Sequence, residues 1–398
     1  DQLQVAEDAV RDGNVSVANI SVLLEVRRLE ADRWNQDPVP LSLFNPSMVP
    51  MPSAWQRSPE ERWLASFRHM ELSHELTHCM PVGMSNVIVL AVLDADFRPT
   101  RPLRLLTHED LMPEHFVCQD WPGLVYLGPE DPRLFRNGET IMMLFFSRRP
   151  AKTLHTKCPG HLGRARGAGR MYMAEIQEDL LAHGHQVIPL ASETHGKAPA
   201  IGRKRLGGSE KNWGPFVYTD ESGRERVFVE EDMHPHIVLS MDENFTTGEV
   251  IYNTSSPIVE RWSRKVYGRA MSVHGGVAPV LFTEGIPGLD LEPPFYISIL
   301  HTRWWGGRMS DLQVYDSFLC AFEAKPPFSI VKVGHKVLPL VREQSVFYFL
   351  VAFPTQMLRV RDGLEDDDGD HLMILYGAGD AAARVLRLPL HRLKEFLH

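Results

Sequence analysis

The chain has 398 residues, of which 43% are hydrophobic and 23% charged, so it is long and apolar enough to bury a large soluble core. Its formal net charge of −9 gives no overall basic field, which argues against nucleic acid or an acidic membrane surface as the main partner. The sequence contains no run of about 18 apolar residues, so it predicts no membrane-spanning helix.

Several features are compatible with passage through the secretory pathway. Acceptor sequons for N-glycosylation occur at Asn14, Asn19, Asn244 and Asn253. Because the chain opens at Asp1 rather than at a methionine, we expect that a signal or anchor segment has been removed. The sequence therefore predicts the lumenal domain of a type II membrane protein, in the Golgi, that meets the membrane only through that anchor.

The cysteines leave two alternatives open. The chain has four cysteines, namely Cys79, Cys118, Cys158 and Cys320. They form two disulfides in an oxidising lumen, or they are simply buried thiols.

The first 40 residues differ from the rest of the chain in the spacing of their apolar residues. Between Val15 and Asn35, apolar residues recur at near-helical spacing, which predicts an N-terminal helical arm over residues 1–40. After Pro38, short apolar runs alternate with clusters of Gly, Pro, Asn and Asp, and these runs are typical of strands. The predicted strands include 63–72, 87–93, 140–146, 236–241, 295–300, 345–353 and 372–376.

Long helical periods are scarce between Pro99 and Ala381, and the strands recur without the intervening helices that a parallel sheet needs. This pattern predicts an all-β sandwich, barrel or propeller. Strand pairs that continue over most of the chain favour repeated four-stranded blades, because one barrel rarely uses so many residues. We therefore expect residues 41–398 to form a β-propeller.

Two segments place carboxylates at the tip of an apolar strand. Gly128–Phe135 contains Glu130 and Asp131, and Leu372–Asp380 ends in an aspartate. Strand-end loops are where a rigid all-β scaffold presents its chemistry, so this pattern indicates a carbohydrate-type site.

The main basic cluster runs from Lys197 to Lys211, and Arg148-Arg149 forms a second one. Such a cluster is either a solvated charge run or a site that neutralises phosphate groups.

His74-Glu75-Leu76-Thr77-His78 matches the H-E-x-x-H pattern of zinc proteases. The usual third ligand is missing, since Met84 stands where the longer pattern has its final histidine. We expect a loop between two strands here and no metal site. The chain also lacks a D-x-D triplet, and Asp366–Asp368 is predicted to be an exposed acidic turn, so we expect catalysis without a divalent ion.

A set of short motifs, in this order along the chain, resembles the five-bladed propeller β-mannoside phosphorylases and hydrolases. The landmarks are Asn45-Pro46-Ser47, Arg68, Glu130-Asp131-Pro132-Arg133, Lys211-Asn212-Trp213, Pro235-His236, Gly275-Gly276 with Pro279, Leu300-His301, and Tyr376 to Asp380. The resemblance covers Asn45 to the C-terminus and implies a five-bladed β-propeller behind the N-terminal helical arm. Glu210 to Phe216, followed by Pro235-His236, is most similar to the fungal-type β-1,2-mannosyltransferases.

The resemblance also implies a set of site residues. Asp131 is implied as the sole catalytic acid or base, although an aspartate before a proline is otherwise typical of a turn. The implied substrate-binding residues are Arg68, Glu130, Arg133, Lys211, Asn212, His236, His301, Arg303 and Asp380. Among them Lys211, His236, His301 and Arg303 are candidates for the phosphate or diphosphate, and Asp380 for sugar hydroxyls.

The implied activity is inverting β-mannosyl transfer, of the β-1,2 type, from GDP-mannose to a mannan or mannosylated glycan acceptor, with no cofactor. One alternative is a β-mannoside phosphorylase that uses mannose 1-phosphate. The phosphorylases commonly have Tyr-His-Gly where this chain has Leu300-His301-Thr302, which disfavours free phosphate. A propeller lectin without catalytic activity and a zinc protease are further alternatives.

Overall fold

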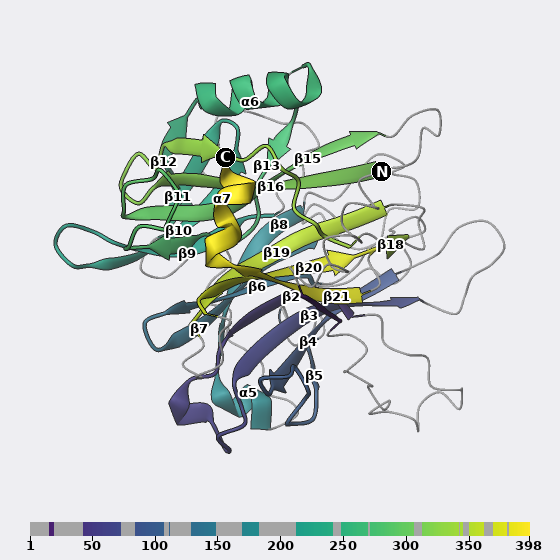
Figure 1. Cartoon of the computed structure of the whole chain (residues 1–398). Helices are drawn as coiled ribbons and strands as arrows, with labels where there is room; N and C mark the ends of the chain where they lie inside the picture. Colours follow the sequence, from purple (N-terminus) through teal and green to yellow (C-terminus); the bar gives the residue numbers. More distant parts are fainter. Residues whose placement is uncertain are drawn as a thin grey trace, which may run out of the picture.

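The computed structural model describes residues 16–19, 43–72, 84–106, 111, 129–148, 169–182, 212–241, 248–269, 271–305, 313–341, 343–344, 350–361, 369–379 and 382–398. These residues are mostly strands, and the strands form a five-bladed β-propeller (Figure 1). The all-β fold class and the five-bladed architecture are thereby confirmed. In the described part of the chain, no helix is long and apolar enough to cross a bilayer.

The first three blades are separate antiparallel sheets. The first contains β2 (Leu43–Pro50), β3 (Trp63–Leu72), β4 (Met84–Leu93) and β5 (Arg104–Leu106). The second contains β6 (Pro129–Asn137), β7 (Thr140–Arg148) and β8 (Gly169–Ile176). The third contains β9 (Gly214–Thr219), β10 (Glu225–Met233), β11 (His236–Met241) and β12 (Gly248–Thr254).

The last two blades are joined by a short parallel pair between Val314 and Leu350 and by an isolated parallel bridge between Ala278 and Gln356. The fourth blade contains β13 (Val273–His274), β14 (Val280–Phe282), β15 (Phe295–Trp305), β16 (Gln313–Glu323) and β17 (Ile330–Val333). The fifth contains β18 (Glu343–Gln344), β19 (Leu350–Val360), β20 (His371–Ala378), β21 (Ala382–Pro389) and β1 (Ser16–Asn19).

The strand β1 lies within the segment that was expected to be a helical arm. It pairs antiparallel with β21, with Val17 opposite Leu386. An outer strand of a blade has unpaired backbone donors and acceptors, and an extended segment satisfies them where a helix does not. At these four residues the expected helix is therefore a strand, and the remainder of residues 1–40 lies outside the described part of the chain.

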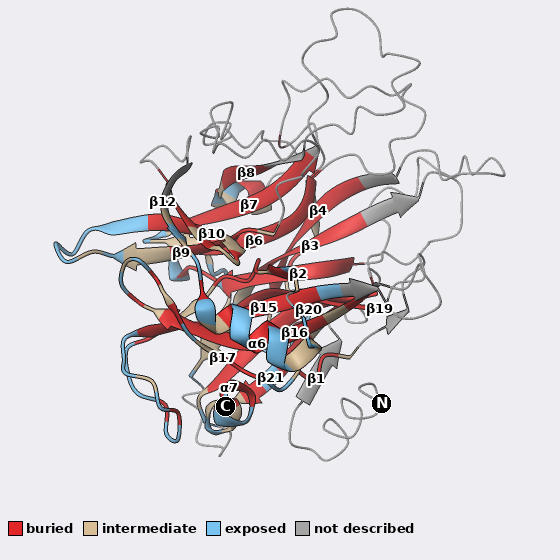
Figure 2. Ribbon diagram, turned by 90° about the horizontal axis from the view of Figure 1, so that it is seen from above, coloured by how far each residue is buried: buried red, intermediate tan, exposed pale blue. Residues whose placement is uncertain are grey.

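Each pair of neighbouring blades encloses its own apolar core. The core between the first two blades includes Leu64, Ile88 and Leu134, whereas the core between the fifth and first blades includes Ala65 and Val89. Successive residues of β3 and β4 therefore enter two different cores, because side chains alternate between the faces of a strand. This burial of both faces explains why the strands appear in the sequence as nearly continuous apolar runs (Figure 2).

The helices lie outside the blades. The longest described helix, α6 (Pro257–Tyr267), packs Val259 and Trp262 on the core between the third and fourth blades. The sequence did not predict this helix, because helical periods are scarce in this part of the chain. Its ends carry recognisable helix signals, since the Ser256 side chain accepts from Val259 N and Gly268 is left-handed at φ 70°. The short helices are α5 (Glu178–Ala182), α7 (Leu393–Leu397), η1 (Ser53–Trp55) and η2 (Leu390–Arg392).

The ring of blades is closed at the centre by one buried amide. Gln356 on β19 accepts hydrogen bonds from Ser47 Oγ at 2.6 Å and from Met48 N, both on β2. Its Nε2 donates to Leu134 O on β6 at 3.0 Å. The side chain is only 2% exposed, so the fifth blade is bonded to the first and second blades through a group that water does not reach.

Replacing Gln356 by Met tests this closure. The change keeps the length of the side chain but leaves buried donors and acceptors on β2 and β6 unsatisfied, so we expect a loss of about 2–4 kcal/mol in the free energy of unfolding. Urea denaturation measures this loss, and Gln56→Met at an exposed position is the control. An equal effect of the two changes would contradict the closing role of Gln356.

Candidate active site

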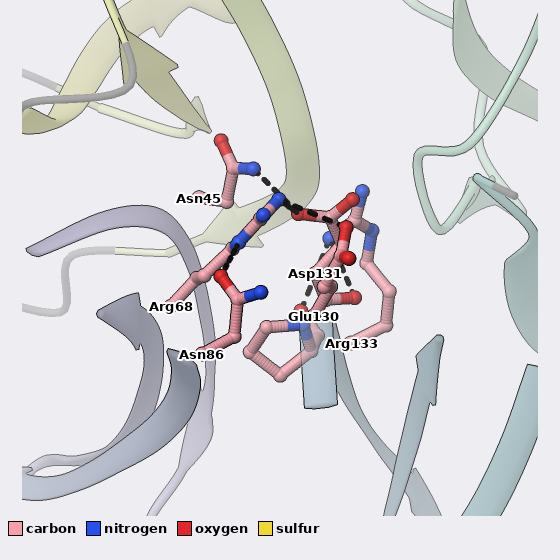
Figure 3. A network of polar contacts seen from close by, with 7 residues as sticks. Asn45, Arg68, Asn86, Glu130, Asp131 and Arg133 are labelled. Carbon is pink, nitrogen blue, oxygen red and sulfur yellow. Dashed lines mark hydrogen bonds and ion pairs between the residues drawn. The ribbon is translucent and has the colours of Figure 1, made fainter. Parts of the chain in front are cut away.

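Charged side chains from the first two blades meet at the centre of the propeller (Figure 3). Arg68 Nη1 on β3 is 3.2 Å from Glu130 Oε2 and 3.0 Å from Asp131 Oδ1, both on β6. Asn45 Nδ2 on β2 donates to the same Asp131 oxygen at 2.7 Å. Glu130 is 1% exposed and Asp131 is 7% exposed. Two adjacent buried carboxylates therefore share one guanidinium.

The two carboxylates lie within the first residues of β6, rather than in a loop beyond a strand end as expected. The pairing of β6 with β7 is irregular between Glu130 and Arg133, so the extra residues form a bulge. Asp131 within it has a left-handed φ of 54°, which few residues other than glycine adopt. Such bulges redirect a side chain away from the regular alternation of a strand. Here the bulge turns Asp131 toward Arg68 and Asn45 (Figure 3).

Arg133 is a buried brace behind this pair. Its Nε donates to Gly276 O at 3.0 Å, and its Nη1 donates to Asp131 O and Pro132 O at 3.2 and 3.1 Å. Burial lowers the pKa of Arg133 to about 10, and the charge of Asp131 opposes this shift. Arg133 therefore remains a cation at neutral pH, and it ties the bulge of the second blade to the fourth blade.

His301 on β15 lies on the other side of this brace. Its ring centroid is 5.7 Å from that of His274 and 5.2 Å from that of Phe353, and Phe353 also lies 5.9 Å from the Arg133 guanidinium. Burial lowers the pKa of His301 to about 3, and the charges of His274 and Arg133 add to the shift. His301 is therefore neutral at physiological pH. It can donate or accept a hydrogen bond, but it does not supply positive charge to a phosphate.

The other predicted residues are distributed more widely. Arg303 is exposed and lies on the same face of β15 as His301, two residues along. His236 belongs to the core between the third and fourth blades, where its Nδ1 is 2.8 Å from Phe328 O and its Nε2 is 3.3 Å from Glu230 Oε2. Burial raises the pKa of Glu230.

Asn212 lies two residues before the start of β9 and has a left-handed φ of 65°. Its backbone passes so close to Gly276 that a Cβ there would lie 2.7 Å from Asn212 O.

Some of the predicted features lie outside the described residues. These are Lys211, Asp380, the zinc-protease-like motif at 74–78, the basic residues 197–211, the turn at 366–368, and Cys79, Cys118 and Cys158. The fourth cysteine, Cys320, is a buried free thiol whose pKa is raised by burial. Among the residues that the structure describes, no group of three or more His, Cys, Asp or Glu side chains could hold a metal ion.

Sequence reasoning missed two polar partners at the centre. Asn86 on β4 accepts from Arg68 Nε at 2.8 Å and so fixes the guanidinium from behind. It stands immediately before the apolar run from Val87 to Leu93, and an amide at the start of a buried strand is the signal that could have identified it. Gln356 gave no comparable signal, because its partners come from blades that are far away in the sequence.

No protein-family model matches the sequence, and no curated protein matches it significantly. Among solved structures, the β-1,2-mannobiose phosphorylase from Listeria innocua matches with a TM-score of 0.50 and 11% identity, over 91% of this chain and 95% of that chain. The mannose phosphorylase MPT-4 from Leishmania mexicana matches with a TM-score of 0.47 and 11% identity, over 89% and 85%. The GDP-Man-dependent mannosyltransferase MPT-1 from the same organism matches with a TM-score of 0.45 and 11% identity, over 88% and 85%.

At this level of identity, the likeness to the Listeria protein shows the propeller fold and no activity. The two matches below a TM-score of 0.5 add no evidence about this chain. The fold that the sequence landmarks implied is confirmed, and the chemistry depends on the residues at the centre.

Replacing Arg68 by Met should leave two buried carboxylates without their shared cation. We expect a loss of about 3–5 kcal/mol in the free energy of unfolding at pH 7, measured by urea denaturation. Adding Glu130→Gln to this variant should recover part of the loss, because only one of the two carboxylates then remains. The control is Arg98→Met, since Arg98 and Asp96 pair at the surface with side chains 66% and 70% exposed. A loss no larger than that of the control would contradict the central ion pairs.

The depressed pKa of His301 predicts a pH dependence of stability. Below its ordinary pKa of 6.5 the unfolded chain binds a proton here, whereas the folded protein does so only near pH 3. The contribution of the neutral His301 side chain to the free energy of unfolding is therefore fully present above pH 6.5 and is lost as pH falls from 6.5 toward 3. His301→Phe should make the unfolding free energy fall less steeply over this range, whereas His391→Phe at an exposed position should not. Equal slopes for His301→Phe and the wild type would refute the prediction.

Proposed function

We propose that this protein is an inverting β-mannosyltransferase that transfers mannose from GDP-mannose to a mannan or mannosylated glycan, with Asp131 as its catalytic base. The observation that carries the proposal is the buried carboxylate of Asp131, held at the centre of the propeller by Arg68 and Asn45. The family resemblance of the motif Glu130 to Arg133 gives this carboxylate its role.

In this reaction, Asp131 takes the proton from the acceptor hydroxyl as that oxygen attacks the anomeric carbon. The bond from the anomeric carbon to the phosphate oxygen breaks on the opposite face, GDP leaves, and the configuration inverts. A single base is sufficient, because the departing diphosphate is a good leaving group once cations stabilise its charge. The proposed mechanism uses no divalent ion and no cofactor.

The substrate contacts are assigned by charge and exposure. Arg303, an exposed cation on the face of β15 that also carries His301, is proposed to contact the diphosphate together with Lys211. His301 contributes as a neutral hydrogen-bond donor. Asn212 and Asp380 are proposed to bind sugar hydroxyls. Glu130 holds the Arg68 guanidinium that it shares with Asp131, and Arg133 holds the backbone carbonyl of Asp131. His236 is left out of this direct role, because its polar partners are Glu230 and Phe328 in an apolar core.

We also propose that the protein works in the lumen of the secretory pathway, in the Golgi, where mannosylated acceptors are available. The sequon at Asn253 supports this location, because Asn253 is exposed on the outer strand β12 of its blade.

The test compares wild type and Asp131→Asn with β-mannobiose as the acceptor, offering GDP-mannose and mannose 1-phosphate in parallel with a chelator present. We expect turnover with GDP-mannose alone, and a loss of about 100-fold or more in kcat/KM in the variant because the base is removed. Asp96→Asn at the surface is the matched control and should retain the activity.

Other outcomes lead to other assignments. Turnover with mannose 1-phosphate in place of GDP-mannose would identify a β-mannoside phosphorylase. Binding of β-mannobiose without turnover of either donor would identify a lectin. Activity that survives Asp131→Asn would remove the assigned base, and activity lost with the chelator would remove the metal-independent mechanism.

A further inference from the structure

We infer that Asn45 is a positioning residue for Asp131. We also infer that Gly377 on β20, in the fifth blade, holds the Asn45 amide in place through a close contact, which we call the seat. The inference concerns the same site and rests on the proposed function for its catalytic consequence. Its structural part can be tested without any activity.

The orientation of the Asn45 amide follows from its contact with Asp131. An ionised carboxylate only accepts hydrogen bonds, so the Asn45 group that lies 2.7 Å from Asp131 Oδ1 is the NH₂ group. The amide oxygen must then point the other way. Within the described residues, Asn45 Oδ1 is buried and has no hydrogen-bond partner. On its oxygen side the amide is therefore held by packing and not by a hydrogen bond.

Gly377 on β20 provides that restraint. A Cβ built on Gly377 would lie 2.1 Å from Asn45 Oδ1 and 3.1 Å from Asn45 N, so the amide occupies the space that any side chain would fill. Gly377 does not have the positive φ that would require a glycine for backbone reasons. The glycine is thus needed for the close approach of Asn45, and the backbone of β20 forms a wall behind the amide.

The backbone of Asn45 is held from the same blade. Its left-handed φ of 51° is a strained conformation that persists where the surroundings enforce it. Thr355 Oγ1 donates to Pro46 O, and Gln356 Oε1 accepts from Ser47 Oγ at 2.6 Å. The fifth blade therefore fixes the two residues that follow Asn45 as well as its side chain.

These contacts form a chain across three blades. The fifth blade seats Asn45 of the first blade, and Asn45 holds the carboxylate of Asp131 on the second. Misplacing a reacting group by about 1 Å can cost about 100-fold in rate. Disturbing the seat at Gly377 should therefore impair the reaction at Asp131 although Gly377 does not bond to it.

The test uses Gly377→Ala, Asn45→Gly and the double variant, with Gly285→Ala as the control because a Cβ at Gly285 meets nothing within 4 Å. Asn45→Gly is compatible with the left-handed backbone and removes the side chain that carries the amide. Each single change should lower kcat by about 10- to 100-fold with KM nearly unchanged. The double variant should be no slower than Asn45→Gly, because the added methyl then has no amide to displace and meets only the backbone nitrogen of residue 45, at 3.1 Å. Independent, multiplying losses, or an effect on KM alone, would overturn the inference.

Crystal structures of wild type and Gly377→Ala separate this inference from the proposed function. We expect the Asn45 amide to be displaced and the Asp131 carboxylate to move with it. An Asp131 carboxylate that keeps its place while Asn45 moves would overturn the positioning role, whether or not the protein turns over GDP-mannose. Displacement of both groups in a protein that turns over no donor would reject the proposed function and leave the seat established.

Discussion

The ion pairs between Arg68 and the carboxylates of Glu130 and Asp131 are the interaction on which the centre of this propeller depends. Two adjacent buried carboxylates repel each other and lose their hydration, so they are tolerated only with a cation and donors in good geometry. The first blade supplies these donors through Arg68 and Asn45. The second blade supplies the carboxylates on a bulged strand. The site therefore exists only when the two blades are assembled.

The closed ring makes this assembly rigid. The amide of Gln356 bonds the fifth blade to the first two, and Arg133 bonds the second blade to the fourth through Gly276 O. Deeply buried polar groups are costly unless their hydrogen bonds are satisfied. They therefore favour the one arrangement of the blades that satisfies them, rather than adding much net stability. The five apolar cores between the blades provide the bulk of the driving force, and the polar centre specifies the geometry.

The sequence predicted the part of this structure that follows from burial of both faces of a strand. The apolar runs at 63–72 and 236–241 coincide with β3 and β11, and the repetition of such runs indicated blades. The motif around Asp131 and the distant Arg68 were brought together as the resemblance implied. Local patterns could not show that His301 is neutral or that His236 faces a core, because both depend on neighbours from other blades. The helix α6 was not predicted for a different reason, since its only local signals are the capping residues at its two ends, within a chain whose other apolar runs are strands.

In the proposed reaction, the carboxylate held by Arg68 and Asn45 marks the place where the sugar reacts. The most direct measurement is a crystal structure of Asp131→Asn with GDP-mannose and β-mannobiose bound. We expect the acceptor hydroxyl within about 3 Å of the side chain at position 131, with the anomeric carbon of the donor beyond it. Density for the donor and acceptor elsewhere on the propeller, with the centre closed to both, would contradict the account.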